Sequence, residues 1–107
     1  MTQIMIDGVI IGSGFPPYVI AELSGNHNGD ISKAFKIMEM SKSAGANAVK
    51  LQTYRPDTIT IDSDLEEFQL TEGLWAGKSL WELYDLAHTP WEWHKPIFDY
   101  AQQLGIT

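Results

Sequence analysis

The amino-acid sequence predicts an α/β fold in which parallel strands alternate with helices. Two runs, "YVIAEL" (18–23) and "AVKLQT" (48–53), are strand-like, and a helical pattern lies between them over residues 31–44. A strand, a helix and a strand joined by a short loop form a βαβ unit, and such units build parallel sheets. Two strands cannot cover both faces of a parallel sheet. We therefore expect the opening part of a larger (β/α)8 TIM barrel of about 250 residues, with a compact three-layer α/β domain as the alternative.

Composition narrows the class of protein. The 107 residues are 44% hydrophobic and 20% charged, as in an ordinary globular domain. A net charge of −7 argues against nucleic acid or anionic membrane as a partner, although a local lysine can still bind a small anion. The absence of cysteine excludes disulfides and thiolate–metal sites. No signal-peptide pattern or apolar run of about 20 residues occurs, so we expect a cytoplasmic protein.

The N-terminal segment predicts a small hairpin. "QIMI" and "VIIG" flank Asp7-Gly8, a dipeptide that suits a tight hairpin turn, so we expect paired strands over residues 3–12. "GSGFPP" then breaks regular structure. We expect residues 1–17 to form a hairpin and linker, and residues 18–107 to form the first βα units of the barrel domain, ending at the start of a third strand.

Helix signals recur along the rest of the chain. Asp30 is a predicted N-cap, and a stripe at helical spacing predicts one buried face: Ile31, Ala34, Phe35 and Met38. Residues 54–78 are too long for a routine loop and predict an inserted or functional lobe. Ser79–Glu82 and Thr89–Glu92 both match capping boxes. The Ser79–Glu82 box predicts a helix with a buried stripe of Leu80, Leu83, Tyr84 and Ala87. The Thr89–Glu92 box predicts a helix that ends at Gly105, and Pro96 is expected to bend this helix.

The second strand carries the clearest chemical signal. Side chains alternate along a strand, so Val49 and Leu51 are expected to face the helices while Lys50 and Gln52 face the barrel interior. A buried ammonium needs an anion, and at the carboxyl end of a barrel strand a substrate phosphate or carboxylate supplies one. The alternative is an exposed lysine on an edge strand.

The first strand ends in unusually polar chemistry. Glu22 can accept hydrogen bonds from sugar hydroxyls, bind a metal or transfer a proton; alternatively it forms an ion pair with Lys50. In the loop that follows, His27 is either a metal ligand, a general base or a structural residue, and Asn26 suits a turn. His88 and His94 lie near helix ends, where caps or surface positions are expected.

Three motifs, taken together, suggest a family. "IAELSGNHNGD", "AGANAVKLQTY" and "EGLWAGKSLWELYDLAHTPWEWH" resemble the sialic acid synthases, and the last is most similar to their pseudaminic acid synthase branch. The resemblance implies a (β/α)8 barrel followed by a small antifreeze-like domain, in a domain-swapped homodimer, so a homo-oligomer is expected. It also implies a reaction that joins phosphoenolpyruvate to an N-acylated amino sugar, giving a nine-carbon 2-keto sugar acid and phosphate.

The resemblance assigns roles to residues already singled out. Glu22 would contact the sugar and act as the catalytic residue, Lys50 would contact phosphoenolpyruvate, and Gln52 would support the same pocket; Asn26 and His27 complete the expected substrate-binding set. A divalent metal (Mn²⁺ or Mg²⁺) is implied, with ligands on strands beyond this chain. We therefore expect the full-length parent to be an enzyme and this chain alone to be inactive. The alternatives are a related phosphoenolpyruvate-dependent synthase and a non-catalytic α/β module that self-associates.

Overall fold

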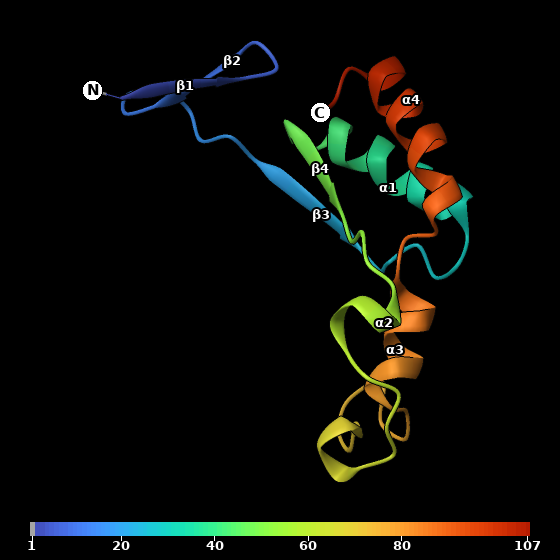
Figure 1. Ribbon diagram of the computed structural model, residues 1–107. Helices are drawn as coiled ribbons and strands as arrows, with labels where there is room; N and C mark the ends of the chain where they lie inside the picture. Colours follow the sequence, from blue (N-terminus) through green and yellow to red (C-terminus); the bar gives the residue numbers. More distant parts are fainter. Residues whose placement is uncertain (1) are drawn as a thin grey trace.

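The computed structural model describes residues 2–107 as an elongated molecule of 49 × 33 × 23 Å (Figure 1). Helices and strands alternate after an N-terminal hairpin. In chain order the elements are β1 (Gln3–Ile6), β2 (Val9–Gly12), β3 (Ile20–Ser24), α1 (Ile31–Ser43), β4 (Ala48–Leu51), α2 (Pro56–Ile59), the 3₁₀ turn η1 (Glu66–Phe68), α3 (Leu80–Ala87), the 3₁₀ turn η2 (Trp91–Trp93) and α4 (His94–Leu104).

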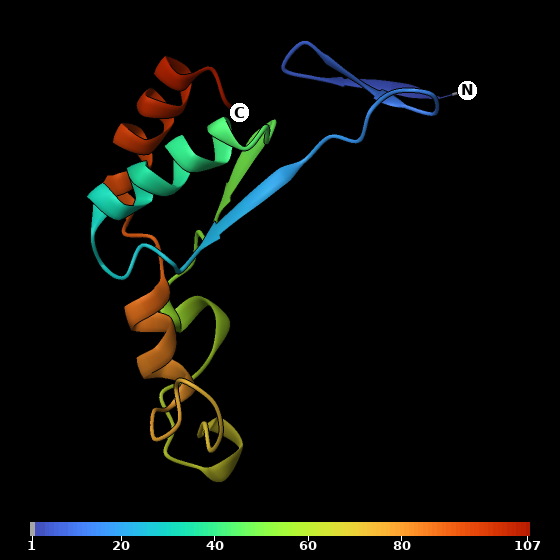
Figure 2. The same ribbon diagram turned by 180° about the vertical axis from the view of Figure 1, so that it is seen from behind.

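The body of the molecule is the predicted βαβ unit. β3 and β4 pair in parallel, with Glu22 opposite Lys50, and the register shifts between Glu22 and Ser24. α1 and α4 both lie on one side of these strands, as Figures 1 and 2 show from opposite directions. The core forms between the strands and these helices from four buried side chains: Leu23, Ala34, Met38 and Ile97. Within residues 2–107 the sheet does not close into a barrel.

The helix stripes are confirmed to different degrees. In α1, Ala34 and Met38 are buried, while Ile31 and Phe35 are half-buried. The four stripe residues of α3 are all half-buried, and none is fully buried. α3 lies at the end of the sheet rather than across its face (Figure 1), so it has less apolar surface to cover.

Three predicted helix ends are confirmed by their hydrogen bonds and backbone angles. Asp30 caps α1, because its carboxylate accepts the Ser32 N–H at 2.8 Å. Ser79 and Glu82 form the reciprocal capping box of α3. Gly105 ends α4 in the left-handed region at φ 73°, where a side chain would be strained.

The second predicted capping box is wrong. Thr89 is fully buried, and its hydroxyl finds no hydrogen-bond partner among the described residues. The chain instead makes η2, and α4 starts only at His94. Pro96 is therefore in the first turn of α4, where no amide hydrogen is needed, and the expected bend does not arise.

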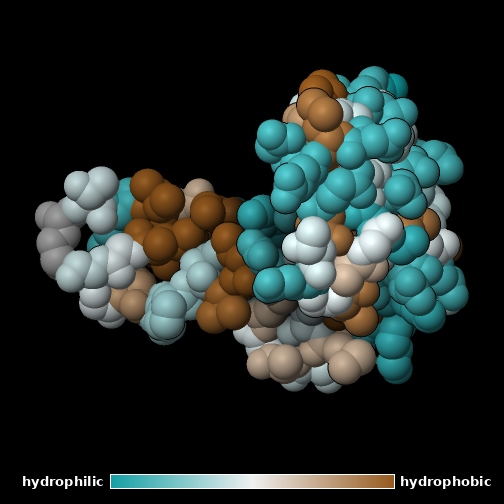
Figure 3. Space-filling model, turned by 90° about the horizontal axis from the view of Figure 1, so that it is seen from below, coloured by the Kyte–Doolittle hydropathy of each residue, from teal (hydrophilic) through white to brown (hydrophobic). Residues whose placement is uncertain are grey.

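The N-terminal hairpin is confirmed. β1 and β2 pair antiparallel, and Asp7 and Gly8 take the positive φ angles of 47° and 82° that a two-residue turn requires. The hairpin stands apart from the helices (Figure 1), although the Thr107 hydroxyl donates to the Asp7 carboxylate at 2.6 Å. Figure 3 shows apolar side chains over this projecting part of the molecule, where Ile4 and Met5 are largely exposed.

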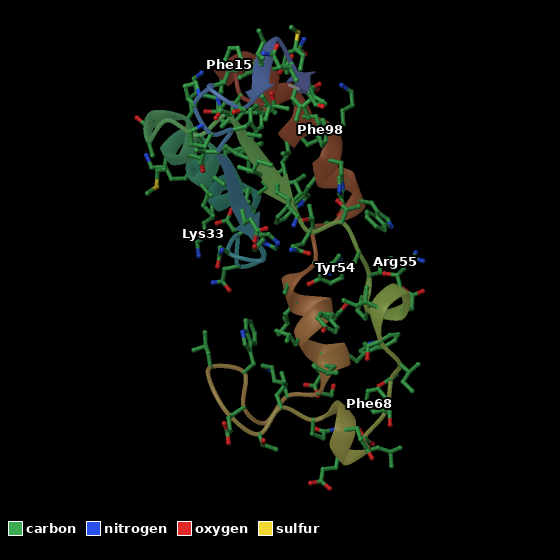
Figure 4. All side chains as sticks on the ribbon, turned by 90° about the vertical axis from the view of Figure 1, so that its left-hand side faces the viewer. Phe15, Lys33, Tyr54, Arg55, Phe68 and Phe98 are labelled. Atoms are coloured by element: carbon green, nitrogen blue, oxygen red, sulfur yellow. The ribbon has the colours of Figure 1, made fainter. Side chains whose placement is uncertain are left out.

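The long connection after β4 does form a separate lobe. α2 packs against α3, and a single antiparallel bridge joins Gln69 to Ser79. Tyr54 lies where the chain leaves β4, and its ring meets the ring of Tyr84 edge-on at 5.5 Å (Figure 4). Burial raises the pKa of Tyr54, which therefore stays protonated at neutral pH.

Thr107 pairs with the free edge of β4 as a residue of a neighbouring parallel strand would. Thr107 donates its N–H to the Asn47 carbonyl at 3.1 Å, and its carbonyl accepts the Val49 N–H at 2.7 Å. This is the bonding pattern of a residue in a parallel strand next to β4. A groove of about 440 Å³ continues along this edge between β4 and α4, and Leu51, Ile97 and Phe98 are among its lining residues.

None of the helices within residues 2–107 combines the length and the apolar character that a membrane span requires.

Candidate functional site

Glu22 and Lys50 form an ion pair on the open face of the sheet, which is the face of β3 and β4 that α1 and α4 leave uncovered. They are opposite each other in the β3–β4 register, and their carboxylate oxygen and ammonium nitrogen lie 3.1 Å apart. Val49 and Leu51 point to the helix side and pack against the core, as the alternation predicted. Lys50 therefore points away from the helices, toward the side of the sheet that α1 and α4 leave uncovered (Figure 2).

Exposure decides what this ion pair can do. The side chains of Glu22 and Lys50 are 56% and 57% exposed. An ion pair in contact with water contributes about 1 kcal/mol or less to stability, so a ligand can displace one partner at little cost. A ligand phosphate or carboxylate can replace Glu22 at the ammonium, which leaves the Glu22 carboxylate free to accept hydrogen bonds from hydroxyl groups.

Gln52 lies directly beyond the end of β4. The strand ends at Leu51, one residue earlier than an inward-facing strand position for Gln52 would need, and Gln52 is half-buried. Its backbone carbonyl accepts the Thr89 N–H at 3.1 Å, so the exit of β4 is fixed to the chain segment after α3.

The β3–α1 loop (residues 25–30) turns tightly beside this centre. Asn28 and Gly29 take positive φ angles of 51° and 73°. A side chain at Gly25 would bring its Cβ within 2.9 Å of the Ala87 Cβ, so only glycine permits the loop to lie this close to the end of α3. Asn26 is exposed on the loop, next to the end of β3.

His27 is the one buried side chain of that loop. It is only 1% exposed, and its Nδ1 accepts the Gly29 N–H at 2.9 Å. The ring meets Trp93 edge-on at 4.9 Å. Burial lowers the pKa of His27, against a smaller opposing effect of the Ala87 and His88 carbonyls. A substrate contact by His27 stays a prediction that this buried position does not favour.

The other two histidines are confirmed near helix ends. His88 follows α3, and its Nδ1 lies 2.7 Å from the Asp85 carbonyl. His94 begins α4, and its Nδ1 lies 3.1 Å from the Trp91 carbonyl, so that nitrogen carries the proton. Its Nε2 then accepts the hydroxyl hydrogen of Thr53 at 2.7 Å. Sequence reasoning missed this contact, since nothing in the local pattern links residues 41 positions apart.

The implied metal has no ligand set in this part of the molecule. Across residues 2–107, no three His, Asp or Glu side chains come together in a way that would hold a metal ion. We therefore assign no metal-binding role to any of them.

Comparison with known proteins identifies the family. Residues 37–107 match the NeuB family. The chain belongs to the NeuB family. It is 51% identical over 89 residues to the pseudaminic acid synthase of Campylobacter jejuni. The aligned region covers 83% of this chain and 26% of that protein. It is 43% identical over 91 residues to the pseudaminic acid synthase of Helicobacter pylori, covering 85% of this chain and 27% of the relative.

A solved structure agrees on the fold. The crystal structure of the N-acetylneuraminic acid synthetase of Leptospira borgpetersenii superposes with a TM-score of 0.75 over 98% of this chain and 32% of that one, at 23% identity. At this identity the likeness shows the fold alone. The chain spans about a quarter of the length of the curated relatives that it matches.

Proposed function

We propose that this chain is part of a synthase that condenses phosphoenolpyruvate with an N-acylated amino sugar to a nine-carbon 2-keto sugar acid of the pseudaminic acid type, releasing phosphate. Membership of the NeuB family supports the reaction class, and the 51% identity to a pseudaminic acid synthase supports the branch. The observation that carries the proposal is Lys50, a lysine on the open face of a parallel sheet whose only charged partner within residues 2–107 is the exposed Glu22.

Each site residue has a part that follows from its position. Lys50 binds a phosphate or carboxylate oxygen of phosphoenolpyruvate, because its ammonium lies on this face and its side chain is 57% exposed. Glu22, released from the ion pair, accepts hydrogen bonds from the sugar and orients its aldehyde carbon toward carbon 3 of the enol. Gln52 and Asn26 border the same end of the two strands and supply neutral hydrogen bonds.

The surrounding architecture is also proposed from these residues. We propose that residues 18–107 form the first βα units of a (β/α)8 barrel, with residues 1–17 as a hairpin and linker before it. The backbone bonds of Thr107 support this, since they continue the parallel pairing beyond β4. We also propose a homo-oligomer, as the family resemblance implies, and a cytoplasmic location, which the cysteine-free sequence favours. The divalent metal of the reaction would be held by residues outside this chain, and no step is derived through it.

The proposal is tested in the full-length synthase by Lys50→Met. Methionine keeps the length and apolar bulk of the side chain but removes its charge. A charge-assisted contact contributes about 1.5–3 kcal/mol, so the KM for phosphoenolpyruvate should rise about 10- to 150-fold. Stability should be unchanged or slightly higher, because the lost ion pair is exposed.

Lys33→Met is the matched control. Lys33 is an exposed lysine of α1 that projects from the molecule (Figure 4), so its replacement should leave the KM for phosphoenolpyruvate unaltered. If Lys50→Met also left this KM unaltered, the assignment of Lys50 would be wrong.

A further inference from the structure

Beyond the open face, the buried His27 has contacts that the proposed function does not use. We propose that His27 is a positioning residue whose neutral ring pins the β3–α1 loop against residues 87–93, and thereby sets how the ends of β3 and β4 lie relative to each other. Those ends carry Glu22 and Gln52, so the catalytic part of the inference rests on the proposed function.

The hydrogen bond to Gly29 fixes the state of the ring. Because Nδ1 accepts the Gly29 N–H at 2.9 Å, Nδ1 carries no proton, and the neutral ring holds its hydrogen on Nε2. The Nε2 atom is buried; the Ala87 and His88 carbonyls lie near enough to affect the pKa of the ring, but no described residue forms a well-aligned hydrogen bond with Nε2. A protonated ring would direct a second N–H at the Gly29 amide, where two donors would face each other.

The ring also joins two parts of the chain that are distant in sequence. It packs edge-on against Trp93 at 4.9 Å, and next to it the backbone of Gly25 lies against Ala87 with no room for a Cβ. His27 is therefore the side chain through which the β3–α1 loop meets the segment between α3 and α4. A ring buried to 99% in an otherwise exposed loop has packing as its evident function.

A backbone hydrogen bond extends this junction to the second strand. Thr89, two residues beyond Ala87, donates its N–H to the Gln52 carbonyl at 3.1 Å. A chain of contacts thus connects β3 with the exit of β4. The β3–α1 loop contacts residues 87–93 through His27, and within that segment Thr89 bonds Gln52. Movement of the His27 ring would therefore change the position of Glu22 relative to Gln52.

The electrostatic surroundings favour the neutral ring. Burial lowers the pKa of His27, and the charge of His88 at the end of α3 acts in the same direction; the Ala87 and His88 carbonyls oppose both. Among the described residues packed against the ring, His88 is the titratable group that influences it, since Trp93 does not titrate.

Three variants separate the acceptor, the ring and the charge. His27→Phe keeps an aromatic ring against Trp93 but removes the acceptor for Gly29. His27→Asn loses the ring but places an amide oxygen close to the position of Nδ1, so it can still accept the Gly29 N–H. His88→Gln is the matched control, because it removes a histidine whose side chain bonds only the backbone of its own helix.

The experiment combines kinetics with NMR on the full-length protein. We expect His27→Phe to lower kcat about tenfold or more while the KM for phosphoenolpyruvate changes less than about threefold, because Lys50 keeps its place in the strand. His27→Asn should recover most of kcat, and His88→Gln should behave as the parent protein. Nitrogen-15 spectra should show Nδ1 unprotonated, and the amide resonances of Gly29 and Gln52 should shift in His27→Phe alone.

The outcomes that overturn the inference are distinct from those that overturn the proposed function. A kcat for His27→Phe equal to that of His88→Gln, or a protonated Nδ1, would refute the positioning role. Equal loss of kcat in His27→Phe and His27→Asn, in proportion to their loss of thermal stability, would also refute it. If the parent protein does not turn over phosphoenolpyruvate, the proposed function fails, and the nitrogen-15 spectra still decide the state of His27 and its link to Gln52.

Discussion

The two faces of the β3–β4 sheet differ sharply. On the helix side, Leu23 is fully buried, and Val49 and Leu51 pack against the core below α1 and α4. On the other side, Ile20 is 53% exposed, and Glu22 and Lys50 form an ion pair that water reaches. Alternation along the same nine residues of strand produces both faces, so neighbouring positions have opposite roles.

The difference separates stability from chemistry. The helix side gains its free energy from buried apolar surface, and it tolerates substitution poorly. The open side contributes little to folding in this chain, which leaves its charges available for a ligand. Substitutions on the helix side should therefore mainly cost stability, and substitutions of the open-side charges should mainly cost activity.

The largest expected effect is on the helix side. Leu23→Ala should lower the free energy of unfolding by about 2–5 kcal/mol, since it leaves a cavity between β3 and the helices. Ile20→Ala, on the same strand but the open face, should cost less than about 1 kcal/mol. Chemical denaturation of both variants measures this. Equal losses would mean that the open face is covered in solution.

The exposed apolar surface predicts self-association of the 107-residue chain. Phe98 is 67% exposed beside the free edge of β4, and Met40 and Ile20 are 60% and 53% exposed. Unpaired strand edges and apolar patches attract further chains. Light scattering at micromolar concentration should detect oligomers. A synthase assay of the same sample should detect no activity. A sharp monomer with a cooperative thermal transition would favour a self-contained module instead.

Glu22→Gln tests the second charge of the open face in the full-length synthase. The amide removes the negative charge but keeps the size of the side chain. We expect turnover or sugar affinity to fall about tenfold, as for the loss of one charge-assisted hydrogen bond, with a smaller change for phosphoenolpyruvate. Titration with each substrate separates the two. A loss confined to phosphoenolpyruvate would show that Glu22 only holds Lys50 in place.

A smaller effect is expected at the start of α3. Ser79→Ala removes the hydroxyl that accepts the Glu82 N–H and should cost about 0.5–2 kcal/mol of unfolding free energy. Ser43→Ala, at the exposed end of α1, is the control and should be neutral. Because Ser79 lies in the lobe, at the end of α3 opposite to Ala87, the KM for phosphoenolpyruvate should not change. A changed KM would couple this lobe to the open face.

The smallest effect is on acid stability. His27 has a lowered pKa in the folded protein, so the unfolded chain binds a proton more readily below pH 6.5. Its contribution to stability is therefore complete above that pH, and it declines as the pH falls from there through the lowered pKa. Thermal unfolding between pH 7 and pH 5 should show a decline that His27→Asn reduces. An unchanged decline would assign it to other groups.

Local sequence rules predicted most of the fold. The Asp7-Gly8 turn, the Asp30 cap and the Ser79 capping box each depend on a few neighbouring residues, and each is confirmed. The prediction that Thr89 caps a helix is wrong, although Thr89 fits the same capping rule. Its N–H bonds the Gln52 carbonyl and its side chain is enclosed, so packing between distant segments overrides the local preference.

Local sequence rules also predicted part of the candidate site. Alternation in "AVKLQT" was enough to place Lys50 opposite the helices. The burial of His27 was not predictable, because Trp93, which packs on its ring, and Ala87, which lies against Gly25 of the same loop, come from segments some 60 residues later. The loop sequence left a structural role as one of three alternatives for His27, and the tertiary contacts favour that role.

The central claim is that the open face is where an anionic substrate binds. The most direct measurement is a crystal structure of the full-length protein with phosphoenolpyruvate. We expect a phosphate or carboxylate oxygen of the ligand within hydrogen-bond distance of the Lys50 ammonium, with the Glu22 carboxylate turned away from its present 3.1 Å contact. A ligand bound elsewhere, with the Glu22–Lys50 pair intact, would contradict it.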